Sequence, residues 1–241
     1  MEAKLRVRRY DPSGNECAEY QLYTIEMPQS ATVLDALLAT RESIDGSLAF
    51  RCACRSAICG SCAMRINGES RLACKTKIVE AAPRGQTVTL EPLANLPTLK
   101  DLVADMGPFY DKMRAIVPWL ATDPSKRAPV REYLVDAARS TKLSQFAACI
   151  QCGACYSACP IVALDDSYLG PAALAKAYRY CHDPRDGAKG ERLSRLAHEQ
   201  GLWRCHTIFS CTEQCPKGVN PTEAIQNLKK MALLKRLRLL R

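Results

Sequence analysis

The sequence predicts a two-domain chain in which a small α+β domain is followed by an all-α domain. Its 241 residues suit two domains of ordinary size, and 47% hydrophobic residues are enough to bury cores. Alternation of apolar and polar residues dominates the first hundred residues, whereas helical periodicity dominates the rest. We therefore expect one domain over residues 1–105 and a second over residues 106–241.

Strand and hairpin patterns account for most of the expected first domain. Period-two alternation is typical of half-buried strands, and it recurs over residues 4–10, 20–27 and 86–93. The turn sequence Asp11-Pro12-Ser13-Gly14 joins the first two of these segments as a hairpin. A second hairpin is expected over residues 63–74, around Asn67-Gly68. Between the hairpins, residues 32–43 carry leucines at helical spacing.

Helical patterns fill the expected second domain. We expect helices within residues 98–120, 129–140, 170–181, 190–203 and 220–237. The last of these has Asn220 as its N-cap, Pro221 at the first helical position and Glu223 in the first turn.

The fourteen cysteines are the main chemical feature of the sequence, and most of them are clustered. Five lie between Cys52 and Cys74, four between Cys149 and Cys159, and three between Cys205 and Cys215. The sequence from Met1 leads straight into a strand-like pattern, so we expect no secretory signal, and no apolar stretch has the length of a membrane-spanning helix. We therefore expect an intracellular, reducing location, which disfavours disulfides, so the clustered cysteines indicate metal sites.

The first cysteine group has the spacing of a plant-type [2Fe–2S] site. The pattern is C-x4-C-x2-C followed by a distant fourth cysteine, and its members are Cys54, Cys59, Cys62 and Cys74. Small residues in this loop, Ala57, Gly60 and Ser61, allow backbone N–H groups to turn toward the sulfurs. Cys52 competes with Cys54 for the first position but gives a longer spacing. A tetrahedral four-cysteine zinc site is the alternative, although only one C-x2-C pair is present.

The second cysteine group is the run of a bacterial ferredoxin, C-x2-C-x2-C-x3-C-P. It contains Cys149, Cys152, Cys155 and Cys159, followed by Pro160. In ferredoxins with two clusters, the fourth cysteine of each run binds the other cluster. The third group repeats the spacing with Cys205, Cys211 and Cys215, but Ile208 occupies the second position.

Exchange of the fourth cysteines produces two unequal ligand sets. The complete set is Cys149, Cys152, Cys155 and Cys215, which suits a [4Fe–4S] cluster. The other set has only Cys159, Cys205 and Cys211, so the iron that a cysteine at position 208 would hold is absent, leaving [3Fe–4S]. The alternative is a four-iron cluster with a water or foreign ligand at that corner. Cys17, Cys52 and Cys181 receive no role beyond small buried side chains.

The motifs together resemble one family, the iron–sulfur subunit of succinate dehydrogenase and fumarate reductase (respiratory complex II). The resemblance runs nearly end to end, from "LDALL" and "FRCACRSAICGSCAMRING" through "LKDLVADMGPFY" to "GPAALAKAYRY", "DPRD" and "WRCHTIFSCTEQCPKGVNPTEAI". An isoleucine in the gap of the third group is itself a family feature. Tryptophans that follow the Cys-Pro in succinate–ubiquinone reductases are replaced here by Ala163 and Leu164, so the direction of the reaction and the quinone type stay open.

The resemblance implies a plant-ferredoxin-like β-grasp domain followed by a helical ferredoxin domain. It further implies electron flow from succinate, through FAD in a flavoprotein partner, to [2Fe–2S], [4Fe–4S], [3Fe–4S] and finally quinone. Fumarate reduction is the same route in reverse. The quinone would bind between this subunit and membrane-anchor subunits, near Pro160, His206 and Ile208. The chain would be a peripheral member of a hetero-oligomer on the cytoplasmic face of the inner (plasma) membrane, with no transmembrane segment of its own.

Charge leaves two further interpretations open. The net charge of +9 fits an acidic partner or an ordinary solvated surface. The six basic residues among leucines in residues 227–241 fit either a membrane-facing helix or a solvated helix end.

A cysteine-rich protein that binds zinc and nucleic acid is an alternative from another functional class. Scattered basic residues and 6% aromatic residues argue against it, so we expect no nucleic-acid partner. Another flavin-linked oxidoreductase of similar layout is a third possibility.

Overall fold

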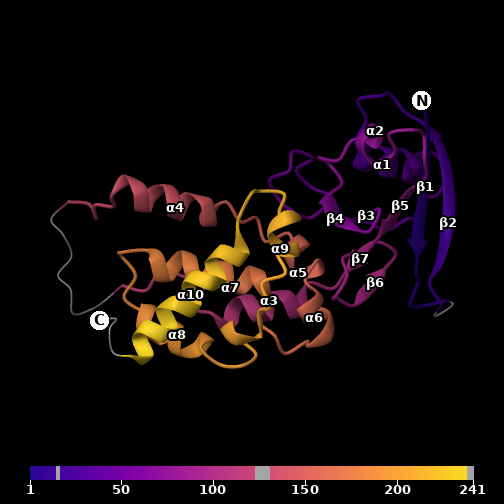
Figure 1. Cartoon of the computed structure of the whole chain (residues 1–241). Coiled ribbons are helices and arrows are strands. Elements are labelled where there is room, and N and C mark those ends of the chain that lie inside the picture. The colour runs from indigo at the N-terminus through magenta and orange to yellow at the C-terminus, as the bar shows by residue number, and fades with distance from the viewer. Residues whose placement is uncertain (15–16, 123–130, 238–241) are drawn as a thin grey trace. The chain divides into compact units, whose positions relative to one another are not determined.

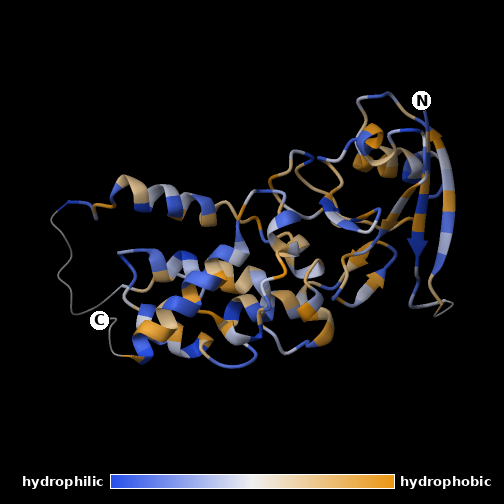
Figure 2. Cartoon of the chain, viewed as in Figure 1, coloured by the Kyte–Doolittle hydropathy of each residue, from blue (hydrophilic) through white to orange (hydrophobic). Residues whose placement is uncertain are grey.

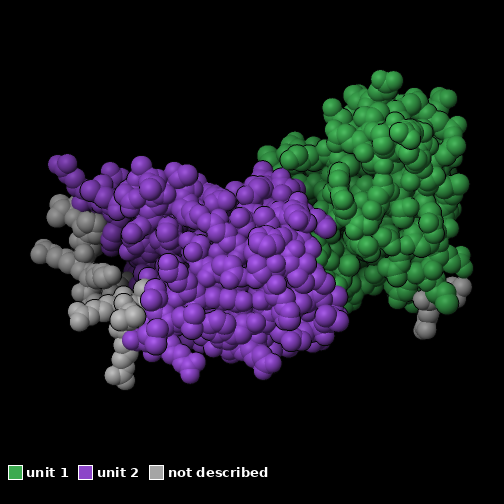
Figure 3. Space-filling model, in the orientation of Figure 1, with its two compact units in different colours: residues 1–107, 150–158 green, residues 108–149, 159–241 purple. Residues whose placement is uncertain are grey.

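The computed structural model describes residues 1–14, 17–122 and 131–237. The chain folds into two compact units (Figure 3). The first contains residues 1–107 and 150–158, and the second contains residues 108–149 and 159–241. The short segment 150–158, which includes Cys152 and Cys155, is therefore grouped with the N-terminal residues.

The first unit is built on a mixed five-stranded sheet of order β2-β1-β5-β3-β4 (Figure 1). The strands are β1 (Glu2–Arg9), β2 (Glu19–Glu26), β3 (Ala63–Ile66), β4 (Glu69–Leu72) and β5 (Val88–Glu91). Neighbouring strands are antiparallel except β1 and β5, which pair in parallel. Both expected hairpins are confirmed. The second turns at Asn67 and Gly68, both with positive φ as the Asn-Gly pair predicts.

Helix α1 (Val33–Ser43) packs its apolar residues into the core of this unit. Thr32 caps its N-terminus, and the Asp35 carboxylate returns a hydrogen bond to the Thr32 backbone, forming a reciprocal capping box. Val33, Leu34 and Leu37 are buried, as their spacing predicts. A short helix, α2 (Ile78–Ala81), follows the second hairpin.

The helical prediction over residues 98–120 is wrong in its first part. A small hairpin of β6 (Thr98–Lys100) and β7 (Val103–Ala104) precedes helix α3 (Gly107–Ala115). Asp101, which is 1% exposed, is the reason. Its carboxylate accepts hydrogen bonds from the Arg9 guanidinium and from the backbone N–H groups of Tyr10 and Ala49. These distant partners hold the turn in a conformation that local periodicity does not reveal.

The second unit is helical. Besides α3 it contains α4 (Ala137–Ala147), α6 (Pro160–Leu164), α7 (Gly170–His182), α8 (Lys189–Leu196), the 3-10 turn η1 (Leu202–Arg204), α9 (Ser210–Glu213) and α10 (Pro221–Arg236). Helix α7 is central, since α4, α8 and α10 all pack against it. Along α10 hydrophilic and hydrophobic residues alternate in short runs (Figure 2). Asn220 caps α10 through the Glu223 backbone N–H, as expected.

Two other expected helices differ in their bounds. The helix expected over residues 129–140 begins only at Ala137, where the Asp136 side chain caps it through the Arg139 backbone N–H, and it continues to Ala147. Residues 129 and 130 lie outside the described part. The helix expected over residues 190–203 ends at Leu196. There the chain turns so tightly that a Cβ on Gly201 would lie 2.2 Å from the Leu196 carbonyl oxygen.

A buried ion pair fixes the interior of the second unit. The Arg192 side chain is fully buried and lies 2.7 Å from Asp186, within the "DPRD" segment. The guanidinium also donates to the carbonyls of Ile116, Val117 and Trp119. Removing one partner of such a pair typically costs about 3–5 kcal/mol, because the other charge stays buried alone. The "DPRD" segment therefore contributes Asp186 to a buried ion pair that stabilises the second unit.

Helices long and apolar enough to cross a membrane do not occur in the described residues. The basic C-terminal segment, expected as an amphipathic helix, is helical through Arg236, and its last residues, 238–241, lie outside the described part.

Candidate iron–sulfur sites

The four cysteines of the first group come together in one loop of the first unit. Cys54, Cys59 and Cys62 precede β3, and Cys74 follows β4, so the β3–β4 hairpin returns the chain to the same place. The sulfurs of Cys62 and Cys74 are 3.3 Å apart. The Cys59 backbone N–H lies 3.3 Å from the Cys54 sulfur. This arrangement of two cysteine pairs suits a cluster of two irons.

Backbone N–H groups in this loop point at sulfur. The Cys54 sulfur accepts hydrogen bonds of 3.3–3.4 Å from three of them, at Ser56, Ile58 and Cys59. The Cys74 sulfur accepts one from Ala57. Positive φ angles at Arg55 and Ala57 turn the chain into this conformation. Such donors stabilise sulfur that carries negative charge and tune a bound cluster.

The thiols of this group differ in acidity. A hydrogen bond with the Ser61 hydroxyl, 3.0 Å away, lowers the pKa of Cys59 to about 6, and backbone N–H groups add to the effect. Burial raises the pKa of Cys62 to about 12. Iron binds cysteine as the thiolate, so a bound cluster would hold both of these sulfurs without a proton.

Gly60 brings this loop against the segment that carries Cys152. A Cβ at Gly60 would lie 2.7 Å from the Cys152 Cβ and 3.1 Å from the Ile150 carbonyl oxygen. Segment 150–158 is itself fixed within the first unit, because the buried Ser157 hydroxyl bonds with the Ser70 hydroxyl and the Ala94 backbone N–H. The small residue is therefore required for close approach, beyond the loop flexibility expected from the sequence.

The two ferredoxin-type runs have the same backbone conformation. In the complete run Gln151 and Gly153 have positive φ, 55° and 79°. Thr207 and Phe209 occupy the same positions of the second run, with φ of 60° and 70°. The residue between them is Cys152 in one run and Ile208 in the other.

The hydrogen bonds that follow each run also match. The Gly153 carbonyl accepts from the residues three and four positions later, beginning the short helix α5 (Ala154–Ser157). The Phe209 carbonyl does the same at the start of α9. Phenylalanine rarely adopts a left-handed conformation, which costs on the order of 1–3 kcal/mol. The run that lacks a cysteine has therefore kept the loop geometry of the complete run.

Three cysteines of the second unit line one small pocket of about 20 Å³. They are Cys159, Cys205 and Cys211, the incomplete ligand set expected from the sequence. The rest of the lining is largely apolar and includes Ile161, Pro171 and Ile225. Burial raises the pKa of Cys159 and of Cys211, which is the usual effect of a dry pocket on a thiol.

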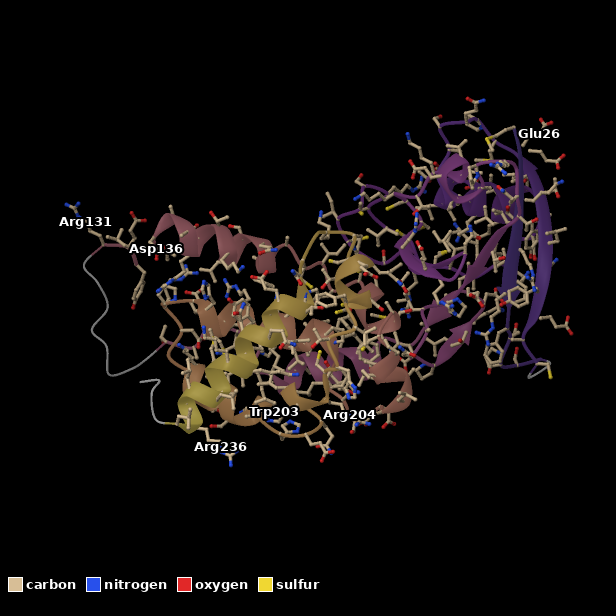
Figure 4. All side chains as sticks on the ribbon, viewed as in Figure 1. Glu26, Arg131, Asp136, Trp203, Arg204 and Arg236 are labelled. Atoms are coloured by element: carbon tan, nitrogen blue, oxygen red, sulfur yellow. The ribbon has the colours of Figure 1, made fainter. Side chains whose placement is uncertain are left out.

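The expected quinone residues lie at the same pocket. Pro160, His206 and Ile208 all contribute to its lining, and all three are exposed. Ile208 keeps 49% of its surface accessible and Phe209 keeps 50%. Trp203 and Arg204, labelled in Figure 4, immediately precede Cys205, and Trp203 is 41% exposed. The three cysteines and an apolar, accessible rim thus occur together.

The members of the complete ligand set are divided between the units. Cys152 and Cys155 belong to the first unit, and Cys149 and Cys215 to the second. Among the described residues, no three His, Cys, Asp or Glu side chains have the arrangement of a site for a single metal ion. Of the cysteines without an expected role, Cys17 is exposed, Cys52 is half-buried and Cys181 is buried.

Comparison with known proteins follows this division of the chain. Residues 4–111 match the model of a 2Fe-2S iron-sulfur cluster binding domain, and residues 145–219 match that of a 4Fe-4S dicluster domain. The "Succinate dehydrogenase iron-sulfur subunit" of Paracoccus denitrificans is 41% identical over 95% of this chain and 87% of that protein. The "Fumarate reductase iron-sulfur subunit" of Mycobacterium tuberculosis is 40% identical over 93% and 90%.

The chain belongs to the iron–sulfur subunits of succinate dehydrogenase and fumarate reductase.

Structural comparison agrees with membership of this iron–sulfur subunit family. A chain of the "Mycobacterium smegmatis Sdh1 complex in the apo form" superposes with a TM-score of 0.83 at 29% identity, covering 98% of this chain and 96% of that one. The cysteine runs and the quoted sequence stretches had indicated this same family.

Sequence reasoning missed two residues of the three-cysteine pocket. Tyr168 and Thr222 both line it, and both are buried. Neither is a member of a cysteine run, although Thr222 lies within the stretch 203–225 that resembles the family and Tyr168 lies two residues before another such stretch. The tertiary fold brings both residues to the pocket of the three sulfurs.

Proposed function

We propose that this chain carries electrons from the FAD of a succinate-oxidising flavoprotein partner, through three iron–sulfur clusters, to membrane quinone. The observation that carries the proposal is the second cysteine run, which keeps the backbone of a cluster loop although Ile208 replaces a cysteine. Loss of the geometry would indicate a decayed motif. Its retention supports a cluster that lacks one iron ligand.

The proposed ligand sets are those of the spacing argument. The [2Fe–2S] cluster takes Cys54, Cys59, Cys62 and Cys74; the [4Fe–4S] cluster takes Cys149, Cys152, Cys155 and Cys215; and the [3Fe–4S] cluster takes Cys159, Cys205 and Cys211. Sulfur-directed N–H groups support the first set, and the shared pocket supports the third. Electrons pass through them in that order.

The mixed sheet with α1 supports a β-grasp assignment for the first domain, residues 1–105, and a helical ferredoxin domain for residues 106–241. The proposed partners are the flavoprotein and one or more membrane-anchor subunits in a hetero-oligomer. The chain would then lie peripherally on the cytoplasmic face of the inner (plasma) membrane.

Quinone is proposed to bind near Pro160, His206 and Ile208, which are exposed at the three-cysteine pocket. Replacing His206 with Ala should reduce quinone reduction by the assembled complex and leave succinate oxidation with an artificial acceptor unchanged. The exposed His198 is the matched control, and His198→Ala should leave both activities intact. If His206→Ala retained full quinone reduction, His206 would have no place in the quinone site.

Fumarate reduction by quinol is the second candidate function. A series of clusters can transfer electrons in either direction. The chain is about equally similar to a fumarate reductase subunit and to a succinate dehydrogenase subunit. The ratio of succinate oxidation to fumarate reduction in the purified complex separates the two directions.

Low-temperature EPR of the anaerobically purified complex tests the proposal as a whole. A sharp signal in the oxidised sample indicates [3Fe–4S], and its replacement by a [2Fe–2S] signal on dithionite reduction completes the expected result. Silence in both states from a metal-replete complex would show zinc instead and would overturn the electron-transfer function.

A further inference from the structure

Each sulfur of the three-cysteine pocket lies near groups that can donate a hydrogen bond to it. At Cys159 these are the backbone N–H groups of Ile161 and Val162, at the start of α6. At the other two sulfurs they include side-chain hydroxyls, Tyr168 beside Cys205 and Thr222 beside Cys211. Backbone donors come with the loop, whereas these two hydroxyls depend on the residue type.

Tyr168 is a buried phenol, with 1% of its surface exposed. It lies between the α6 and α7 helices and lines the same pocket as Cys205, with its hydroxyl near the Cys205 sulfur. A sulfur bound to iron has no proton, so in a hydrogen bond between the two groups the phenol is the donor. The Lys112 ammonium donates to the Tyr168 carbonyl, 2.8 Å away, which helps to hold the backbone of this residue in place.

Thr222 is 2% exposed and lies in the first turn of α10. Its hydroxyl oxygen is 3.4 Å from the Cys211 sulfur. The Thr212 hydroxyl lies 3.0 Å from the same oxygen and 3.0 Å from the Asn220 side-chain oxygen. The Thr222 backbone N–H donates to the Thr212 oxygen, which holds the two threonines together. A Cys211 sulfur bound to iron has no proton, so in its contact with Thr222 the hydroxyl is the donor.

We propose that the Tyr168 and Thr222 hydroxyls raise the reduction potential of the three-iron cluster. The higher potential favours this cluster as the terminal electron acceptor among the three clusters of the chain. Reduction adds one negative charge, which spreads over the cluster and its thiolates. Hydrogen bonds to charged acceptors are stronger than those to less charged ones, so the donors stabilise the reduced form more than the oxidised form. Hydrogen bonds to sulfur are among the factors that set cluster potentials.

The inference rests on the proposed function, because it assumes that Cys205 and Cys211 bind the cluster. Its test is an EPR-monitored redox titration of the assembled complex, following the oxidised [3Fe–4S] signal. Tyr168→Phe removes one oxygen and keeps the ring, so the midpoint potential should shift downward. Thr222→Val should also shift it downward, and the double variant should show a larger downward shift than either single variant.

Two control variants separate hydrogen bonding from packing. Tyr180 is a neighbouring tyrosine of the same unit whose hydroxyl donates to the Pro118 carbonyl, and Tyr180→Phe should leave the potential unchanged. Thr222→Ser keeps the hydroxyl and should keep the wild-type potential, unlike Thr222→Val. The comparison of Thr222→Ser with Thr222→Val tests whether a hydroxyl sets the potential even if Tyr168→Phe fails to retain the cluster.

An unchanged potential in Tyr168→Phe and Thr222→Val, with the signal present, would overturn the inference and leave the proposed function intact. Equal downward shifts in Thr222→Ser and Thr222→Val would also overturn it, because loss of packing would then be the cause. Absence of the oxidised signal from the wild-type complex would instead refute the proposed function.

Discussion

The two ferredoxin-type runs, residues 149–160 and 205–216, share a backbone and differ in what it presents. Both turn through left-handed residues at matching positions and start a short helix from the same carbonyl. Only the residue in the second cysteine position changes the ligand count, Cys152 in one and Ile208 in the other. Loop geometry and ligand number are thus separable properties of a cluster site.

The surroundings of the runs also differ at one left-handed position. A Cβ on Gly153 would lie 3.1 Å from the Met106 side chain and 3.2 Å from the Leu93 side chain, so these two side chains would have to shift slightly to admit a larger residue. Phe209 holds the equivalent position with half of its surface accessible. The left-handed position is therefore more crowded in the complete run.

Restoring the missing ligand would remove the difference in ligand number between the two runs. Ile208→Cys should convert the three-iron cluster to a four-iron cluster, because the loop already has the conformation that presents a thiolate in the complete run. Iron content should rise by one iron per chain, and the sharp oxidised EPR signal should disappear.

Ile208→Ala is the control for this change. It removes the side chain without supplying a ligand, so the three-iron signal should persist. Unchanged iron content in Ile208→Cys, with the complex assembled, would show that position 208 does not face the cluster.

The reciprocal change tests the complete run. Cys152→Ala should remove one ligand from the four-iron cluster and release the iron at that corner, so a second three-iron signal should appear in oxidised EPR spectra. A four-iron cluster with unchanged spectra would exclude Cys152 as a ligand. Cys52→Ala, at a cysteine outside the proposed sets, should leave all the clusters unaltered.

Gly60, in the loop of the first cysteine group, lies against Cys152 of the complete run. Gly60→Ala should lower the thermal midpoint of the complex, since the new Cβ overlaps Cys152 and the residue has a φ of 77°. Gly85 is the matched control, with a φ of 70° and no neighbour within 4 Å. Left-handed strain alone costs about 1–2 kcal/mol, so any larger loss in Gly60→Ala measures the contact. Equal losses in both variants would show that the contact contributes nothing.

The smallest expected effect concerns the strain at Phe209. Phe209→Gly should relieve its left-handed backbone at the expense of some packing by a half-exposed ring, for a net gain of less than about 1 kcal/mol. Gly153→Ala should act in the opposite direction. Denaturation of the two variants measures both effects, and a clear loss of stability in Phe209→Gly would show that the ring is an essential packing element.

Local patterns predicted the five strands of the main sheet, its two hairpins and the Asn220 cap. Asn67-Gly68 specifies its own turn, and Asn220 with Pro221 specifies a helix start, because these preferences act over a few bonds. The pattern failed where distant groups intervene. Asp101 forms a hairpin in place of the expected helix because Arg9, Tyr10 and Ala49 satisfy its carboxylate.

The sequence by itself determined the cysteine runs, the exchange of fourth cysteines that the proposed ligand sets use, and the position of the missing ligand. Covalent spacing carries that information, since thiolates a fixed number of residues apart reach one cluster. Tertiary structure alone decided which hydroxyls reach the sulfurs. Tyr168 lies 37 residues before Cys205, and no cysteine spacing points to it or to Thr222, so only the tertiary fold places their side chains beside the sulfurs of Cys205 and Cys211.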